Sequence, residues 1–198
     1  MALGLALGLA LAAAGGLYLL RRGYSARARP SAMEEAIARR LRHLATPPGA
    51  RSLANPVALT PEVLAEARAH FADHCAICHA NDGSGETPIG QGLYPKAPDM
   101  RRRPTQELTD GELFYIIRNG VRFTGMPGWG TGPEHEDHDS WGLVHLVRHL
   151  PRLTPEELAE MKRLNPKGAH ELAEEREAEE FLRGDAAAAE PPGGRHDH

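Results

Sequence analysis

An uncharged, mostly apolar run opens the chain, from Ala2 to Leu20. A helix rises about 1.5 Å per residue, so a run of this length can cross a bilayer once. Two interpretations stay open. Arg21 and Arg22 directly after the run favour a retained membrane anchor, whereas the small residues Ala12–Ala14 fit the cleavage site of a signal sequence. By charge alone, the arginines that follow the run favour a cytoplasmic C-terminal side.

The next apolar pattern is that of a short amphipathic helix with several arginines. Ser31 and Glu34 have the spacing of a capping box, which marks a helix start. Behind them the apolar residues recur at helical spacing, and the pattern ends before Pro47: Met33, Ile37, Leu41 and Leu44. Contact with a membrane surface and a simple linker role are both compatible with this helix.

Four further segments have helical periodicity. The first begins at Thr60, a cap residue followed by Pro61, and ends at Gly83 and Gly85. The others begin at the capping-box residue Thr109, near Ser140, and at Thr154, and end at Gly120, Leu150 and Leu164 respectively. Loops are expected at residues 47–56, 86–104 and 125–132. Strand-like alternation does not occur in the sequence, so we expect an all-α fold.

Charge is distributed unevenly over the 198 residues. Residues 21–51 hold eight arginines against two glutamates, and residues from 166 onward hold four cations against nine acids. The net charge of −4 argues against a nucleic-acid partner, which requires a basic face. These boundaries predict an anchor or signal sequence at 1–20, a basic linker at 21–56, a folded domain at 57–165, and an acidic, partly disordered tail at 166–198.

Both cysteines of the chain lie in the stretch CAICH, at Cys75 and Cys78, and His79 follows directly. Residues three and four apart are neighbours on a helix, so the two thiols and the imidazole share one face. Such a face can hold a planar ligand at two edge points and at its centre. This is the requirement for covalent haem attachment, with His79 as an axial ligand of the iron.

Two other interpretations of the cysteines carry less weight. A redox-active dithiol requires its C-x-x-C at a helix N-terminus within an α/β pattern, whereas this motif comes at the end of a helix in an all-α sequence. A structural zinc site requires four ligands, and the chain has no second cysteine pair. Haem attachment is therefore favoured.

Met126 is the candidate for the second axial ligand. It lies in Thr124-Gly125-Met126-Pro127-Gly128-Trp129, where neither helix nor strand periodicity explains an apolar side chain. The glycines allow the backbone to approach a flat ligand closely, and a thioether on the iron raises the reduction potential. The alternative is a methionine that only fills a gap in the loop.

The segments HFADHCAICHANDGSGE, DGELFYIIRNGVRFTGMPGW and SWGLVHLVRHLPRLTPEE lie between about residues 60 and 158. Together they resemble the class I monohaem cytochromes c, and most closely the membrane-anchored or periplasmic cytochrome c domains of bacteria. The resemblance implies three core helices around one covalently bound haem c. It also implies that Cys75 and Cys78 bind the haem covalently and that His79 and Met126 are the axial ligands.

By the same resemblance, the Pro98 carbonyl accepts a hydrogen bond from the ring of His79. Arg101 and Trp129 are candidate donors to the haem propionates, and Phe71 should meet Trp141 where the first and last core helices cross. Acidic and histidine residues at 134–139 and 196–198 fall outside the family pattern. They could bind a divalent metal, although a solvated loop and tail is the simpler interpretation.

The resemblance implies an electron-transfer protein rather than an enzyme, working in a respiratory or related redox chain with redox proteins as partners. We expect the haem domain on the periplasmic side of a bacterial inner membrane, held by the N-terminal helix, or free in the periplasm if that helix is cleaved. Two alternatives remain. One is a cytochrome subunit of a larger dehydrogenase or reductase complex, and the other is a haem sensor whose distal ligand can be displaced.

Overall fold

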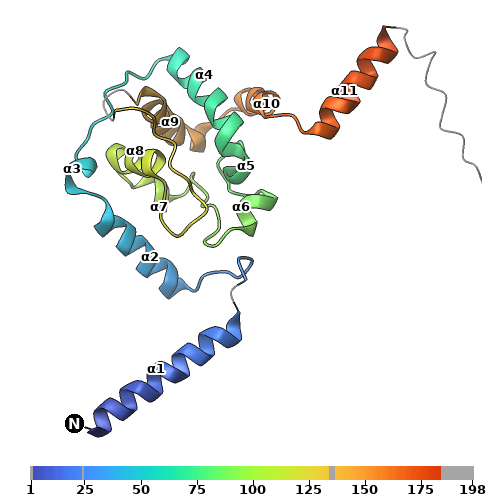
Figure 1. Cartoon of the computed structure of the whole chain (residues 1–198). Helices are drawn as coiled ribbons and strands as arrows, with labels where there is room; N and C mark the ends of the chain where they lie inside the picture. Colours follow the sequence, from blue (N-terminus) through green and yellow to red (C-terminus); the bar gives the residue numbers. More distant parts are fainter. Residues whose placement is uncertain (1, 24, 134–136, 184–198) are drawn as a thin grey trace, which may run out of the picture. The chain divides into compact units, whose positions relative to one another are not determined.

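A computed structural model describes residues 2–23, 25–133 and 137–183 (Figure 1). The chain divides at Leu164 into two compact units. The described residues are helical and contain no strand, which confirms the all-α fold. Residues 134–136 and 196–198, part of the acidic and histidine segments considered as metal ligands, lie outside the described residues.

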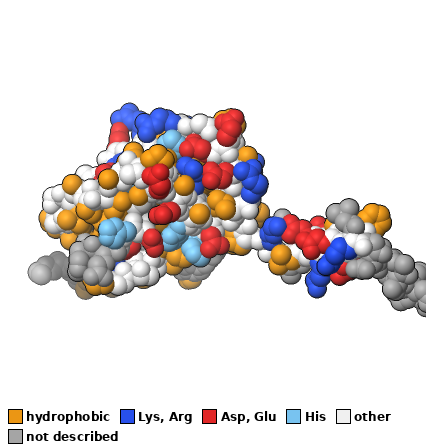
Figure 2. Space-filling view, turned by 90° about the horizontal axis from the view of Figure 1, so that it is seen from above, with side chains coloured by type: hydrophobic (Ala, Val, Ile, Leu, Met, Phe, Trp, Pro, Cys, Tyr) orange, Lys and Arg blue, Asp and Glu red, His pale blue; other side chains and the backbone are white. Residues whose placement is uncertain are grey.

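The first unit contains helices α1 to α10. Their bounds are α1 Ala2–Arg22, α2 Ala32–Ala45, α3 Pro48–Arg51, α4 Pro61–His70, α5 Ala76–His79, α6 Pro88–Gly92, α7 Arg103–Gln106, α8 Asp110–Asn119, α9 His138–His149 and α10 Pro155–Leu164. A π-helical turn, η1, spans Phe71–Cys75 between α4 and α5, and a 3₁₀ turn, η3, spans Leu150–Arg152. In the second unit, α11 spans Ala169–Leu182, and acidic and basic side chains lie side by side on this part of the surface (Figure 2).

The expected helix starts agree with the caps that the structure contains. Ser31 and Thr109 each accept a hydrogen bond from the backbone of the glutamate three residues on, and that glutamate bonds back, which completes both capping boxes. Thr60 caps α4 by accepting from the Val63 N–H. Helix α9 begins two residues earlier than expected because Asp137 accepts from the Ser140 N–H.

Three short helices occupy segments that the sequence pattern assigned to loops. They are α3, α6 and α7, each with four or five residues and a proline in the first turn. Elements of this length are too short to show apolar periodicity, so the expectation of continuous loops at 47–56 and 86–104 was wrong in detail.

The core forms where α4 and α8 pack against α9 (Figure 1). The rings of Phe114 and Trp141 stack face to face, with centroids 4.0 Å apart and planes 8° from parallel. Phe71 belongs to the same buried cluster. The ring stacked on Trp141 is that of Phe114, while Phe71 and Trp141 share this cluster.

Helix α10 is held against α4 by a group of ion pairs. Arg68 on α4 lies 3.2 Å from a carboxylate oxygen of Glu157 and 3.1 Å from one of Glu160, and His149 lies 2.9 Å from Glu157. Met161 of α10 is fully buried. It packs within the hydrophobic core.

One helix in the described residues is long and apolar enough to cross a membrane, over Gly4–Arg21 within α1. Length and composition are all that support this span, and they fit an anchor and a signal sequence equally.

Candidate haem site

The C-x-x-C-H segment follows a change of helix type. Helix α4 passes into the π turn η1, in which the Ala76 N–H donates to the Phe71 carbonyl, and α5 then carries the end of the motif. A π turn holds one more residue than an α turn, so it rotates α5 relative to α4. The expectation of one uniform helix from Thr60 to Gly83 missed this rotation. Single π turns of this kind are frequent at functional sites.

Both thiols are held in their neutral form by their surroundings. Burial, aided by the neighbouring Cys78, raises the pKa of the Cys75 thiol to about 12, and burial also raises the pKa of Cys78. A redox-active dithiol or a zinc site requires the thiolate, which is promoted by a lowered pKa. Among the described residues, no group of three or more His, Cys, Asp and Glu side chains could hold a metal ion. The dithiol and zinc interpretations therefore find no support.

The His79 ring has a nitrogen for which the described chain supplies no partner. Its Nδ1 is buried and accepts or donates no hydrogen bond. Burial also lowers the pKa of His79, which favours the neutral imidazole. A half-buried neutral imidazole beside two neutral thiols fits the attachment site of a c-type haem, because the neutral ring is the form that binds iron.

The bond expected from His79 to the Pro98 carbonyl is not formed in this structure, since Nδ1 has no partner. The backbone of this loop is nevertheless close. A β-carbon on Gly85, whose φ is +74°, would lie 2.5 Å from the Ala97 carbonyl oxygen and 3.2 Å from that of Pro98. Glycine at this position therefore allows the loop to return to the motif.

Thr87 and Gly90 fix the loop directly against the motif. The Thr87 hydroxyl lies 2.8 Å from the Ile77 carbonyl oxygen and 3.2 Å from that of Cys78, and it also accepts from the Gly90 N–H. A β-carbon on Gly90 would lie 2.1 Å from the Cys78 carbonyl oxygen. This hydroxyl binds carbonyls that the end of α5 leaves without helical partners. The turn that presents Cys78 and His79 is thus stabilised from outside the motif.

Met126 lies in a loop that packs against the end of α8. The Val121 N–H donates to the Met126 carbonyl, and the Met126 N–H donates to the Thr124 hydroxyl. Gly120, with φ of +68°, ends α8, and a β-carbon there would lie 2.6 Å from the Met126 carbonyl oxygen. The Met126 side chain is half-buried. Short-range contacts thus define the backbone that carries the candidate ligand.

Arg118 anchors the far end of the same loop and was not singled out from the sequence. Its guanidinium donates to the Gly132 carbonyl at 2.7 Å and lies 2.6 Å from a carboxylate oxygen of Asp137. Asp137 is buried and caps α9. One arginine therefore links α8, the loop after Met126 and the start of α9. From the sequence, Arg118 could be recognised only as a residue in the last turn of a predicted helix.

Replacing Arg118 by alanine should lower the free energy of unfolding by about 3 kcal/mol, because the buried Asp137 carboxylate would lose its charge partner. Guanidinium unfolding followed by circular dichroism measures this loss. The exposed Arg122 provides the matched control, and Arg122→Ala should change stability by less than about 0.5 kcal/mol. Equal stability of the two variants would contradict the anchoring role.

Arg101 is engaged in ion pairs in this structure. It donates to both carboxylate oxygens of Asp99, at 2.8 and 3.0 Å, and to Asp82 at 2.7 Å. A guanidinium has five N–H donors, so about two remain for a haem propionate. Its propionate role stays a prediction. Trp129 stacks on His74 with ring centroids 5.3 Å apart and packs against the core, and its propionate role also stays a prediction.

The Asp99–Arg101 pair predicts a specific acid sensitivity. Hydrogen bonds from Arg101 lower the pKa of Asp99 from its ordinary 3.8 to about 2. A lowered folded-state pKa gives stability that is present above about pH 4 and is lost as the pH falls toward 2. The difference in unfolding free energy between the wild type and Asp99→Asn should therefore shrink by about 2 kcal/mol between pH 5 and pH 2. A difference that does not change with pH would refute this assignment.

Comparison with known families gives one match. Residues 62–147 match the family described as cytochrome c oxidase, cbb3-type, subunit III. The match includes the C-x-x-C-H motif and the Met126 loop, and it ends within α9. The chain contains a class I monohaem cytochrome c domain. No curated protein matches the chain.

The cytochrome c domain binds one haem c covalently and is an electron-transfer module. It begins within α4, so α1 to α3 precede it, and η3 and α10 follow it. The family match thus agrees with haem attachment at the C-x-x-C-H stretch. The role of each single site residue remains a proposal.

Proposed function

We propose that the chain is a one-electron carrier in which Cys75 and Cys78 hold haem c through thioethers and His79 and Met126 are the axial ligands. The observation that carries the proposal is the half-buried His79 ring, whose lowered pKa favours the neutral imidazole, at the end of a motif that also presents two neutral thiols. The bound haem supplies an iron that accepts and gives up single electrons.

The chain's own residues determine what the site can do. The thiols fix the cofactor at its edge, and His79 and Met126 together fill both axial positions, so that a substrate finds no open position on the iron. A soft thioether opposite a histidine favours the reduced state. The buried side chains around the motif, including Phe71 and Ala76, keep water away. These properties suit a carrier rather than an oxygen-binding or catalytic haem protein.

We place the domain on the extracytoplasmic side of a bacterial inner membrane, with α1 as its anchor. Support comes from the apolar length of α1 and from the covalent haem of the family. An anchored carrier meets its partners at a high effective concentration near the membrane surface. A soluble periplasmic form after cleavage of α1 is the alternative.

Spectroelectrochemistry of the purified chain tests the proposal. The expected result is a single one-electron transition, a low-spin ferric spectrum with the weak far-red band of sulfur-to-iron coordination, and a ferrous form that does not take up carbon monoxide. A high-spin ferric haem and rapid carbon monoxide binding would instead assign the chain to haem sensors or ligand-binding enzymes.

A second candidate is a cytochrome subunit of a larger redox complex. It is favoured by the matched family model, whose description is that of an oxidase subunit. Purification from native membranes without crosslinking distinguishes the two. A stable complex with a second redox protein supports the subunit, and a free cytochrome that reduces partners only in collisions supports the carrier.

A further inference from the structure

Helix α2 exposes its apolar side chains. Met33, Ile37, Leu41 and Leu44 are 70%, 51%, 59% and 60% exposed. At 100° per residue they fall within a stripe about 80° wide along one side of the helix. A contiguous exposed stripe of large apolar side chains marks a contact surface more often than scattered single residues do.

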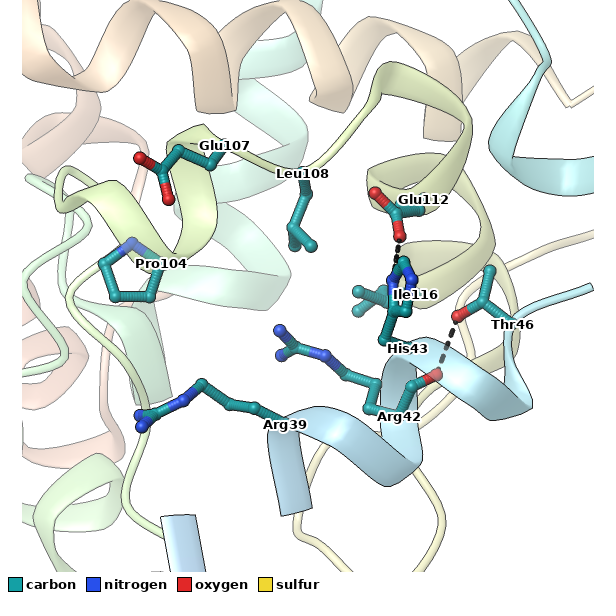
Figure 3. A pocket seen from close by; sticks show the side chains of 9 residues that line it. All are labelled: Arg39, Arg42, His43, Thr46, Pro104, Glu107, Leu108, Glu112 and Ile116. Carbon is teal, nitrogen blue, oxygen red and sulfur yellow. Dashed lines mark hydrogen bonds and ion pairs between the residues drawn. The ribbon is translucent and has the colours of Figure 1, made fainter. Parts of the chain in front are cut away.

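The opposite side of α2 is polar and faces the cytochrome c domain. Arg39, Arg42 and His43 line a cleft of about 530 Å³ whose far wall includes Leu108 and Glu112 (Figure 3). His43 Nδ1 lies 3.0 Å from a carboxylate oxygen of the buried Glu112. Burial lowers the pKa of Arg42, which agrees with its position in this cleft.

Two further contacts hold α2 in this orientation. At its start, the Tyr94 hydroxyl lies 3.2 Å from a carboxylate oxygen of Glu34. Just beyond its end, Arg51 donates to the Thr46 carbonyl at 2.8 Å. Arg51 belongs to α3, which in turn contacts α8. Because His43, on the side of α2 opposite the stripe, pairs with Glu112 of α8, the apolar stripe points away from the domain.

The charge around α2 and the length of its connection to α1 indicate what the apolar stripe contacts. Residues 21–51 carry eight arginines against Glu34 and Glu35, a net +6 without histidine, and Arg40 flanks the stripe. Nine residues join the end of the apolar α1 to the start of α2, and they reach at most about 30 Å. A basic amphipathic helix on so short a connection to a membrane-crossing segment has the features of a helix that lies in the surface of an anionic bilayer.

We propose that α2 is an in-plane membrane contact: its stripe of Met33, Ile37, Leu41 and Leu44 inserts into the surface of an anionic bilayer. On the opposite side of the same helix, His43 binds Glu112 of the domain, and Glu34 beside the stripe contacts Tyr94. The helix therefore fixes which side of the cytochrome c domain faces the membrane. This inference goes beyond electron transfer and does not depend on the axial ligands.

The test uses the full chain with its haem in lipid nanodiscs. Single cysteines are introduced on the stripe, as Ile37→Cys and Leu41→Cys, and their rates of modification by a water-soluble maleimide are measured. Glu35→Cys on the other side of α2 and Leu59→Cys, an exposed apolar position of the domain, are the matched controls. Cys75 and Cys78 are thioether-bound in the holoprotein, and unchanged absorption spectra report an intact haem domain.

In nanodiscs containing phosphatidylglycerol, the two stripe positions should react at least about tenfold more slowly than both controls. In pure phosphatidylcholine nanodiscs this protection should weaken, because Arg40 beside the stripe and the arginines that precede α2 no longer meet anionic headgroups. Stripe and control positions that react at equal rates in the anionic nanodiscs would overturn the proposal. Protection that appears only after addition of a native membrane extract would also overturn it, because the stripe would then belong to a protein partner.

Discussion

Replacing both Cys75 and Cys78 by alanine is expected to abolish covalent haem retention. The sequence contains no other thiol, so the variant has no group that can form a thioether to the cofactor. Essentially all haem in the wild type should stay with the polypeptide during extraction with acidified solvent, and essentially all haem in the variant should pass into the solvent. Haem staining of a denaturing gel gives the same comparison.

The control for this experiment lies inside the motif itself. Ile77 stands between the two cysteines but is 60% exposed, and its hydrogen bond to Thr87 uses the backbone carbonyl. Ile77→Ala should therefore retain its haem. Haem that resists extraction in the double cysteine variant would refute thioether attachment at these residues.

Replacing Met126 by alanine is expected to remove the second axial ligand while leaving the haem attached. The weak far-red band of sulfur-to-ferric-iron coordination should disappear, and the ferrous form should bind carbon monoxide. The reduction potential should fall by more than about 60 mV, a tenfold change in a one-electron equilibrium, because the soft thioether no longer favours the reduced state. Potentiometric titration and absorption spectra measure these changes.

Two other methionines give matched controls. Met100 lies in the loop after the motif and is buried, and Met161 is fully buried in α10. Met100→Leu and Met161→Leu conserve volume and should cost less than about 1.5 kcal/mol each, with the far-red band unchanged. A band that survives in Met126→Ala but is lost in Met100→Leu would move the axial ligand to residue 100.

The elements that the sequence predicted well are those with strong local signals. Ser31, Thr60 and Thr109 mark helix starts because each cap bonds to a backbone within three residues. The C-x-x-C-H stretch is equally local, so haem attachment could be inferred from five residues. Such features depend on neighbours along the chain and not on the tertiary fold.

The features that the sequence could not predict depend on contacts between distant segments. The bonds of Arg118 to Gly132 and Asp137, and the pair of His43 with Glu112, join residues far apart in the chain. The sequence contains no helix breaker at the π turn of residues 71–75, so this turn could not be read from it. The two carboxylate partners of Arg101, Asp82 and Asp99, also became visible only in the folded chain.

The ion pairs between α4 and α10 bear on where this domain ends. Helix α10 lies beyond the family match, yet it contacts the π turn that precedes the motif, and Met161 is fully buried. A fragment cut at residue 147 would leave Arg68 without Glu157 and Glu160 and would uncover the back of the turn that carries Cys75. A fragment that keeps this turn supported therefore has to extend to Leu164, where the first compact unit ends.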